Sequence, residues 1–142
     1  MQFNHLLVVC VGNICRSPMA AYLFKQTLAH VNVQSAGIAA VVGAPVDEKA
    51  QHCMNKLHID MHTHRARQLT FEMLKTADLI LVMSQNQQQH VESEWPFTKG
   101  KVFRLGHWQS LNIADPYRHD QDFFDQIFQQ IQSCVSDWKQ HL

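Results

Sequence analysis

Two apolar runs in this sequence are nearly uninterrupted, and they limit the possible folds more than any other feature does. His5–Cys10 (HLLVVC) and Asp78–Met83 (DLILVM) lack the alternation of apolar and polar residues that marks a strand with one face in water. Strands buried on both faces are typical of parallel sheets that carry helices on each side. Two further short runs, Val31–Ser35 and Lys101–Leu105, complete a predicted set of strands.

Helical periodicity fills the segments between these runs. Apolar residues recur at steps of three and four from Ser17 to Leu28, a second helix is predicted over Asp47–Leu57, and the segment after Gln85 has room for another. The alternation of strands and helices predicts an α/β fold, a single domain over residues 1–142 with a central four-stranded parallel sheet and helices on both faces. The clearest helical stripe comprises Phe124, Ile127, Phe128, Ile131, Val135 and Trp138, preceded by Asp120, Asp122 and Asp125 in the opening turns, where a helix dipole favours anions.

Composition narrows the classes of partner. The chain has 142 residues, and its 12 Lys and Arg balance 12 Asp and Glu, so the net charge is zero. A domain that binds nucleic acid generally is basic, so we expect no such function. No segment approaches the roughly 18 apolar residues of a membrane span, and the N-terminal run lacks the basic start of a secretory signal. We therefore expect a cytoplasmic protein without membrane insertion, whose four cysteines are free or catalytic.

The segment Cys10–Pro18 (CVGNICRSP) joins the end of the first strand to the start of the first helix. Ser17 before Pro18 has the pattern of an N-cap followed by a first helical residue. Such a connection points backbone N–H groups and the positive end of the helix dipole at one place, which creates an anion pocket. Gly12 and Asn13 are residue types that tolerate the left-handed backbone of a tight loop.

A thiol and a guanidinium lie in this predicted pocket. Arg16 can bind two phosphate oxygens at once. Cys10, beside a helix N-terminus and an arginine, is expected to ionise readily and to attack a bound phosphate, with Ser17 hydrogen-bonded to its sulfur. In the alternative interpretation Cys10 is an ordinary buried residue and Arg16 caps a helix; the strand, the Gly-Asn pair and the Ser-Pro pair favour phosphate chemistry. The expected phosphate-binding residues are Val11, Gly12, Asn13, Ile14, Cys15, Arg16 and Ser17.

This chemistry also needs a proton donor, because a phenolate leaves poorly unless it is protonated as the P–O bond breaks. Asp115 is the candidate, and Pro116 holds its backbone in an extended form. An Asp-Pro pair is also a common turn, so the residues alone leave both roles open. Tyr117 either forms a wall of the pocket that stacks on a substrate ring or is a partly buried loop aromatic.

The loop CVGNICRSP resembles the signature of the low-molecular-weight protein tyrosine phosphatases, and the resemblance extends along the chain. It is most similar to the bacterial branch, which includes phosphatases paired with exopolysaccharide tyrosine kinases. The resemblance implies that Cys10 is the nucleophile, Arg16 the phosphate clamp and Asp115 the general acid, with no cofactor and no metal. It also implies that the substrate is a phosphotyrosine protein, with an autophosphorylating tyrosine kinase as the expected partner. Phosphate-like oxyanions are expected to inhibit the enzyme. The matching segments are Ser35–Gly37, His64–Gln68, Asp78–Ser84, Gly106–Trp108 and Asp115–Tyr117.

Supporting roles follow from the same resemblance. Ser35 and His64 would brace Asn13, although as bare residues they are a turn serine and a surface histidine. Cys15 would close a reversible disulfide with Cys10 under peroxide, or it fills the underside of the loop as a small buried residue.

Substrate contacts are expected from the small, apolar loop Ile38–Pro45.

Other functions agree less well with the residues present. An arsenate reductase on the same scaffold would need relay cysteines in Ser84–Trp95, which has none, and Cys53 and Cys134 fall on helix faces instead. A non-catalytic phosphotyrosine-binding or redox module would typically lack the thiol, the arginine or the acid. The histidines near Cys53 match no closed metal site: His52, His58, His62 and His64.

Overall fold

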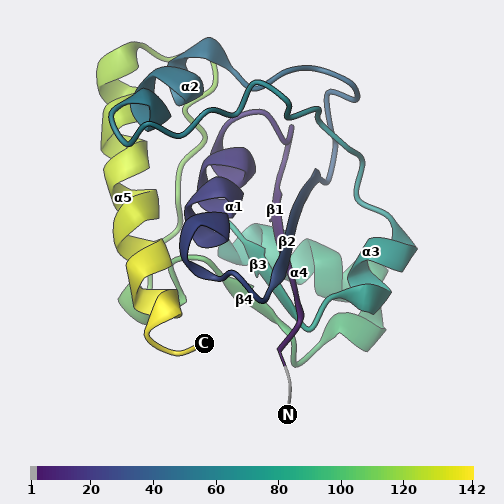
Figure 1. Cartoon of the computed structure of the whole chain (residues 1–142). Helices are drawn as coiled ribbons and strands as arrows, with labels where there is room; N and C mark the ends of the chain where they lie inside the picture. Colours follow the sequence, from purple (N-terminus) through teal and green to yellow (C-terminus); the bar gives the residue numbers. More distant parts are fainter. Residues whose placement is uncertain (1–2) are drawn as a thin grey trace.

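The computed structural model describes residues 3–142, and its centre is a four-stranded parallel sheet (Figure 1). The strands are β1 (His5–Cys10), β2 (Asn32–Gly37), β3 (Leu79–Val82) and β4 (Val102–Arg104), in the spatial order β2-β1-β3-β4. All three pairings are parallel. The predicted fold class is confirmed.

Burial on both faces explains why the sequence of β1 is apolar from Leu6 to Cys10. Leu6 and Val8 pack into one core cluster, whereas Leu7 and Val9 pack into a second cluster on the opposite face. All of these side chains are almost entirely shielded from water. Because neither face of β1 is wet, no polar residue interrupts the run.

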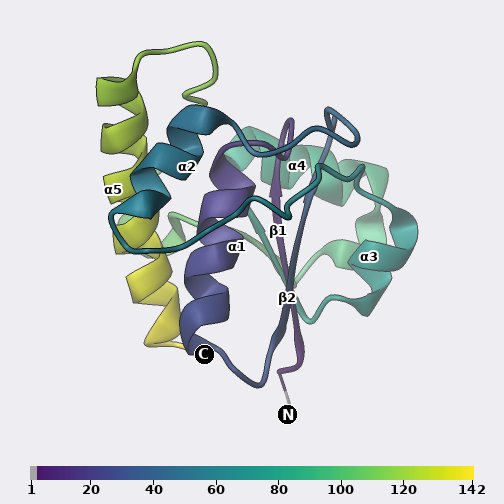
Figure 2. The same ribbon diagram turned by 45° about the horizontal axis from the view of Figure 1, so that its top comes forward.

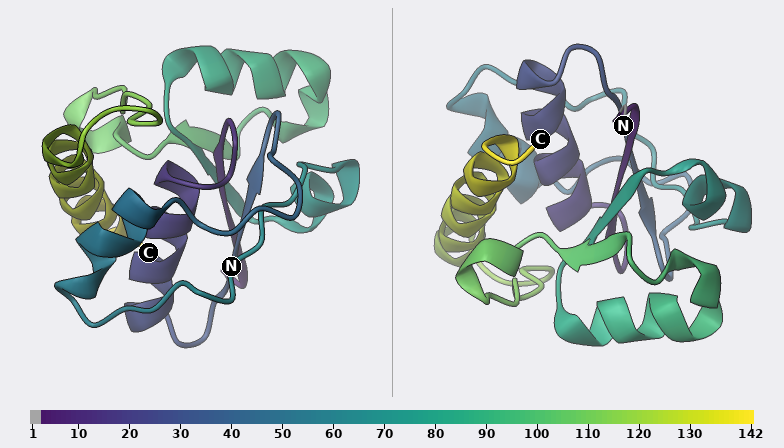
Figure 3. Two further views of the ribbon diagram at one scale, coloured as in Figure 1. Left: turned by 90° about the horizontal axis from the view of Figure 1, so that it is seen from above. Right: turned by 90° about the horizontal axis from the view of Figure 1, so that it is seen from below.

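Helices form a layer on each face of this sheet. On one side lie α1 (Arg16–Thr27), α2 (Glu48–Asn55) and α5 (Gln121–Lys139), and on the other lie α3 (Phe71–Thr76) and α4 (Gln85–Glu94), as Figures 2 and 3 show. The apolar stripe predicted on α5 is buried against α1 and the sheet. Short 3-10 turns at Pro96–Thr98 and His107–Gln109 flank β4.

The main differences from the sequence prediction are a missed helix and a second strand that ends later than expected. The six-residue helix α3 was not predicted, because fewer than two turns are too short to show an apolar period. The second strand was expected to end at Ser35 but continues to Gly37, which pairs with Cys10 on one side and bridges to Gln68 on the other. A Cβ atom at Gly37 would clash with the carbonyl oxygen of Val11, so this close approach requires glycine.

The parallel strand order places the loops after β1 and β4 at the same end of the sheet, where the carboxyl ends of the strands lie. From β2 at one edge, the chain crosses to β3 on the other side of β1, which makes a switch point between β1 and β3. In open parallel sheets, ligands bind beyond the carboxyl ends of the strands at such a point. The loop of residues 11–15 starts there, at the end of β1.

We expect Phe124→Ala to lower the free energy of unfolding by about 3–5 kcal/mol, because it leaves a cavity where a fully buried ring of α5 packs. Urea denaturation followed by circular dichroism measures the change. Gln126→Ala, at an exposed position on the same helix, is the control and should stay within about 0.5 kcal/mol of the unsubstituted protein. Equal losses for both variants would contradict the packing of α5 described above.

Candidate active site

The loop after β1 passes directly into α1, which begins at Arg16. The predicted N-cap at Ser17 is wrong: the cap position is Cys15, and no side chain caps the helix there. Ser17 lies inside the first turn, and its Oγ lies 2.9 Å from the Sγ of Cys10 instead of reaching a backbone N–H. Pro18 fits in this turn because the first N–H groups of a helix lack intrahelical partners.

Asn13 holds the loop in shape. Its φ is 61°, so Asn13, and not Gly12, supplies the left-handed residue of the loop. The fully buried side chain donates from Nδ2 to the Oγ atoms of Ser17 (2.8 Å) and Ser35 (3.0 Å). Its Oδ1 accepts from the backbone N–H of Arg67 (2.9 Å), and its carbonyl oxygen accepts from Nε2 of His64 (2.7 Å). The structure thus brings Ser35 and His64 to the residue that they were expected to brace.

Ser17 links this network to the thiol. Its hydroxyl oxygen accepts from Asn13, so its own hydrogen is available to the sulfur of Cys10. Cys10 is only 2% exposed, at the base of the loop. A hydroxyl fixed in this way can donate to a sulfur that carries negative charge.

Arg16 is buried, and its guanidinium is held by the segment of residues 113–115. Its NH1 donates to the carbonyl oxygen of Ile113 (2.8 Å), and its NH2 lies 3.7 Å from Oδ2 of Asp115. Its Nε is buried without a hydrogen-bond partner among residues 3–142. Such a donor is costly to bury alone, and an oxyanion in the pocket would supply its acceptor. The role of the Ile113 carbonyl could not be predicted from the sequence, because every residue carries the same backbone carbonyl.

Asp115 lies across the pocket from the loop of residues 11–15, on the segment that follows β4. Its Oδ1 accepts from the backbone N–H of Tyr117 (3.1 Å), and its side chain is 47% exposed. Its carboxyl group is therefore accessible both to water and to a ligand in the pocket. The pocket holds about 150 Å³, and Ala39 and Val41 from the predicted substrate loop also line it. Its lining is Cys10, Val11, Gly12, Ile14, Cys15, Arg16, Ala39, Val41, Asp115 and Tyr117.

Comparison with known proteins decides the family. The family model described as low molecular weight phosphotyrosine protein phosphatase matches residues 5–142. This chain belongs to that family. It is 61% identical over 142 residues to the low molecular weight protein-tyrosine-phosphatase Ptp of Acinetobacter johnsonii, and the match covers 100% of both chains.

Solved structures of this phosphatase family agree with the fold. The tyrosine phosphatase AmsI of Erwinia amylovora superposes with a TM-score of 0.94 at 38% identity, over 99% of this chain and 94% of that one. The tyrosine phosphatase Wzb of Escherichia coli K30, solved in complex with sulphate, gives a TM-score of 0.94 at 32% identity over 99% of both chains.

The other thiols of this phosphatase chain lie in surroundings that disfavour a negative charge. Cys15 is buried beneath the loop, and burial, followed by the charge of Asp47, strongly raises its pKa. Burial also raises the pKa of Cys53 to about 12 and that of Cys134 to about 11. All four cysteines are free, and the disulfide between Cys10 and Cys15 stays a prediction. Within residues 3–142, no cluster of three or more His, Cys, Asp or Glu side chains is placed to bind a metal.

We expect Asn13→Gly to lower the free energy of unfolding by about 2–3 kcal/mol, because it removes the side-chain partners of Ser17, Ser35 and Arg67. Asn13→Ala should cost about 1 kcal/mol more, because a Cβ disfavours the left-handed backbone. Urea denaturation of both variants measures the two effects. If alanine were tolerated better than glycine, the left-handed geometry would not be what Asn13 provides.

Proposed function

We propose that this chain hydrolyses phosphotyrosine in proteins through a cysteinyl-phosphate intermediate on Cys10. The supporting observation is the position of the Cys10 sulfur, which lies at the base of an anion pocket 2.9 Å from the Ser17 hydroxyl. Arg16 and Asp115 line the same pocket, so a charge clamp and an acid lie near the sulfur.

In the first step, the backbone N–H groups of the loop and the Arg16 guanidinium bind the phosphate oxygens. The Cys10 thiolate attacks phosphorus as the bond to the phenolic oxygen breaks. Asp115 gives its proton to that oxygen, so tyrosine leaves neutral and the sulfur carries the phosphoryl group.

In the second step, water attacks the same phosphorus. The Asp115 carboxylate takes a proton from the water, and the S–P bond breaks to release inorganic phosphate and the Cys10 thiolate. The Ser17 hydroxyl stabilises the departing sulfur by a hydrogen bond, since its oxygen accepts from the Asn13 amide and its hydrogen is available to donate. Each group therefore returns to its starting protonation state.

The rim of the pocket supports an aromatic substrate. Tyr117 and Val41 line the pocket and are 45% and 49% exposed, so they offer apolar surface to an entering ring. Val11, on the loop of residues 11–15, adds another exposed apolar side chain. The loop of residues 38–45 thus contributes to substrate selection through small side chains.

The alternative functions have less support. An arsenate reductase needs relay cysteines, but Cys53 is buried in α2 against Asp125, and Cys134 is buried in α5. Neither lines the pocket of Cys10. A non-catalytic module would not need an arginine, a thiol and an acid around one small cavity.

The partner that we propose is an autophosphorylating tyrosine kinase of exopolysaccharide or capsule production, met in the cytoplasm. The resemblance to the bacterial branch supports this choice, as does the similarity to phosphatases such as EpsP of Ralstonia nicotianae, at 48% identity over 133 residues. Phosphate-like oxyanions should inhibit by occupying the pocket; Wzb of E. coli K30 was solved with sulphate. Within residues 3–142, no helix combines the length and the apolar character that crossing a bilayer requires.

We expect Cys10→Ser to reduce p-nitrophenyl phosphate hydrolysis by about a thousandfold or more, because the nucleophile is lost. A stopped assay of p-nitrophenol release measures this. Cys134→Ser, which changes a buried thiol away from the pocket, is the control and should keep most of the activity. Full activity in Cys10→Ser would refute the proposed mechanism.

Asp115→Asn removes the proposed acid, so it should slow substrates with poor leaving groups by about 10²–10⁴-fold. Aryl phosphates whose phenols are already acidic should be slowed much less. Steady-state rates across a series of substituted phenyl phosphates test this difference. An equal slowing of every member of the series would remove Asp115 from the role of general acid.

A further inference from the structure

A second polar cleft lies behind the phosphate-binding loop. It holds about 550 Å³ between α1, the edge strand β2 and the segment of residues 63–67. Tyr22 and Lys25 of α1 form one wall, and Arg65 and Arg67 form another. The remaining lining residues are Val31, Asn32, Val33, Gln34, Ser35, Thr63 and His64.

The cleft is strongly positive although the whole chain is neutral. Lys25, Arg65 and Arg67 all line it, and none of its lining residues is acidic. Among the residues that the structure describes, none of these three cations takes part in an ion pair. Three cations without counter-charges in one concave surface attract an anionic partner.

The cationic side chains contact neighbouring groups of the protein. Arg67 donates from NH2 to Oε1 of Gln34 (2.9 Å) and to the carbonyl oxygen of Ser35 (3.2 Å). Arg65 donates from NH1 to the carbonyl oxygen of His64 (2.7 Å), and the Nζ of Lys25 lies 4.5 Å from the centre of the Tyr22 ring. These contacts restrict the three side chains and so reduce the side-chain entropy that binding would cost.

The outer edge of the sheet forms one side of the cleft. β2 is the outermost strand on its side, and the segment of residues 67–69 pairs with it only at Gly37 among the described residues. The earlier residues of β2, from Asn32 to Ser35, line the cleft. The outer edge of a strand offers a row of N–H and C=O groups to an extended chain.

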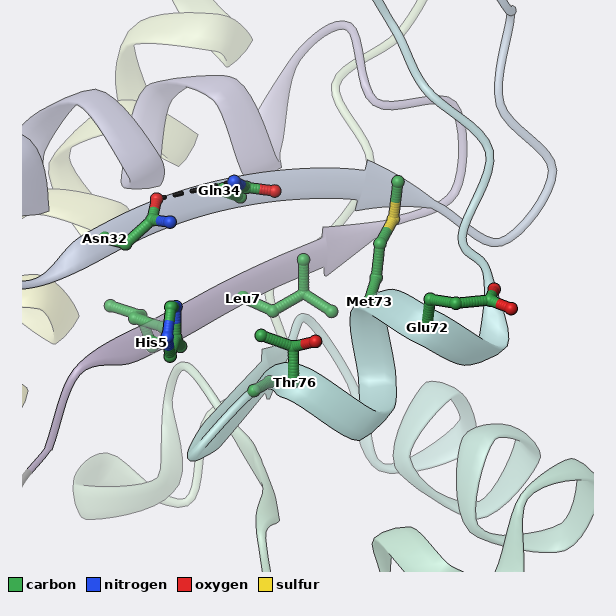
Figure 4. Close-up of a pocket in the computed structure, with 9 residues that line it drawn as sticks. His5, Leu7, Asn32, Gln34, Glu72, Met73 and Thr76 are labelled. Atoms are coloured by element: carbon green, nitrogen blue, oxygen red, sulfur yellow. Dashed lines mark hydrogen bonds between the residues drawn. The ribbon is translucent and has the colours of Figure 1, made fainter.

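A neighbouring hollow on the other face of the sheet differs in chemistry. It lies between β1, β2 and α3 and holds about 250 Å³ (Figure 4). Its walls include Leu7, Met73 and an acidic residue, Glu72, and no lysine or arginine. Of these two hollows, only the polar cleft beside α1 carries the positive charge that would select an anion.

We propose that the cleft formed by Lys25, Arg65, Arg67 and the edge of β2 docks an extended acidic peptide segment of a partner protein. Charge complementarity selects carboxylate or phosphorylated side chains, and the strand edge selects an extended backbone. This docking does not depend on chemistry at Cys10, so it can be tested apart from the proposed catalysis.

The cleft is connected to the catalytic loop through the partners of Asn13. Ser35, His64 and Arg67 line the cleft, and each of them hydrogen-bonds to Asn13. The pKa of His64 is lowered first by burial and then by the charges of Lys25, Arg67 and Arg65. A bound acidic segment offsets those charges and should raise the pKa of His64, which reports occupancy next to the loop.

The probe is a hexaglutamate peptide without phosphotyrosine, titrated into the full chain and followed by amide NMR shifts. We expect shifts at residues 33–35 and 63–67, and an affinity that falls as salt rises. Lys25→Gln with Arg65→Gln should weaken binding by about tenfold, since two exposed charges are lost. Lys75→Gln with Lys99→Gln removes the same charge at exposed positions outside the cleft and should bind as the unsubstituted chain does.

Three results would overturn the proposal: no shifts at the cleft, equal weakening by the two double variants, or tighter binding of a uridine hexanucleotide than of the peptide. The last result would assign the cleft to nucleic acid instead. Hydrolysis of p-nitrophenyl phosphate by both double variants should remain unchanged, because neither changes a residue of the Cys10 pocket. Peptide binding by Cys10→Ser with no turnover would support docking independently of the proposed reaction.

Discussion

The hydrogen bonds around Asn13 are the constraint on which the site depends. Its side chain and its carbonyl oxygen make four bonds, to Ser17, Ser35, Arg67 and His64, and it does so from a left-handed backbone conformation. A loop that curves around an anion has its N–H groups turned inward, and such groups would otherwise repel one another. The bonds from Asn13 hold that curvature before any ligand arrives, which is what preorganised binding of an oxyanion requires.

The sheet provides the rest of the geometry. Cys10 and Asp115 are about a hundred positions apart in sequence, yet the parallel order of the strands places both at the carboxyl end of the sheet, in one pocket. The carbonyl oxygen of Ile113 then anchors Arg16, so the segment after β4 positions both the clamp and the acid. Because the strands are buried on both faces, this end of the sheet cannot shift without disturbing two cores.

Sequence reasoning succeeds where side-chain type carries the information. The unbroken apolar runs predicted the parallel sheet, and a cysteine and an arginine between a strand and a helix predicted the pocket. Asp115 stayed ambiguous, because an Asp-Pro pair serves a turn equally well. The N-cap assigned to Ser17 was wrong, because the sulfur competes for its hydroxyl. The N–H of Arg67 could not be anticipated, since a backbone group leaves no signature in the sequence.

Net charge was the weakest guide, because it averages over the surface. Balanced totals of 12 acidic and 12 basic residues argue against a generally basic protein, but they do not reveal the cleft that three cations and no acidic residue line. The segment of residues 63–67 joins that cleft to the pocket: its side chains line the cleft, while the N–H of Arg67 and the ring of His64 hold Asn13. The polar groups that hold the phosphate-binding loop in place thus also lie at the outer surface of the protein. The same groups that stiffen the loop are available to a partner.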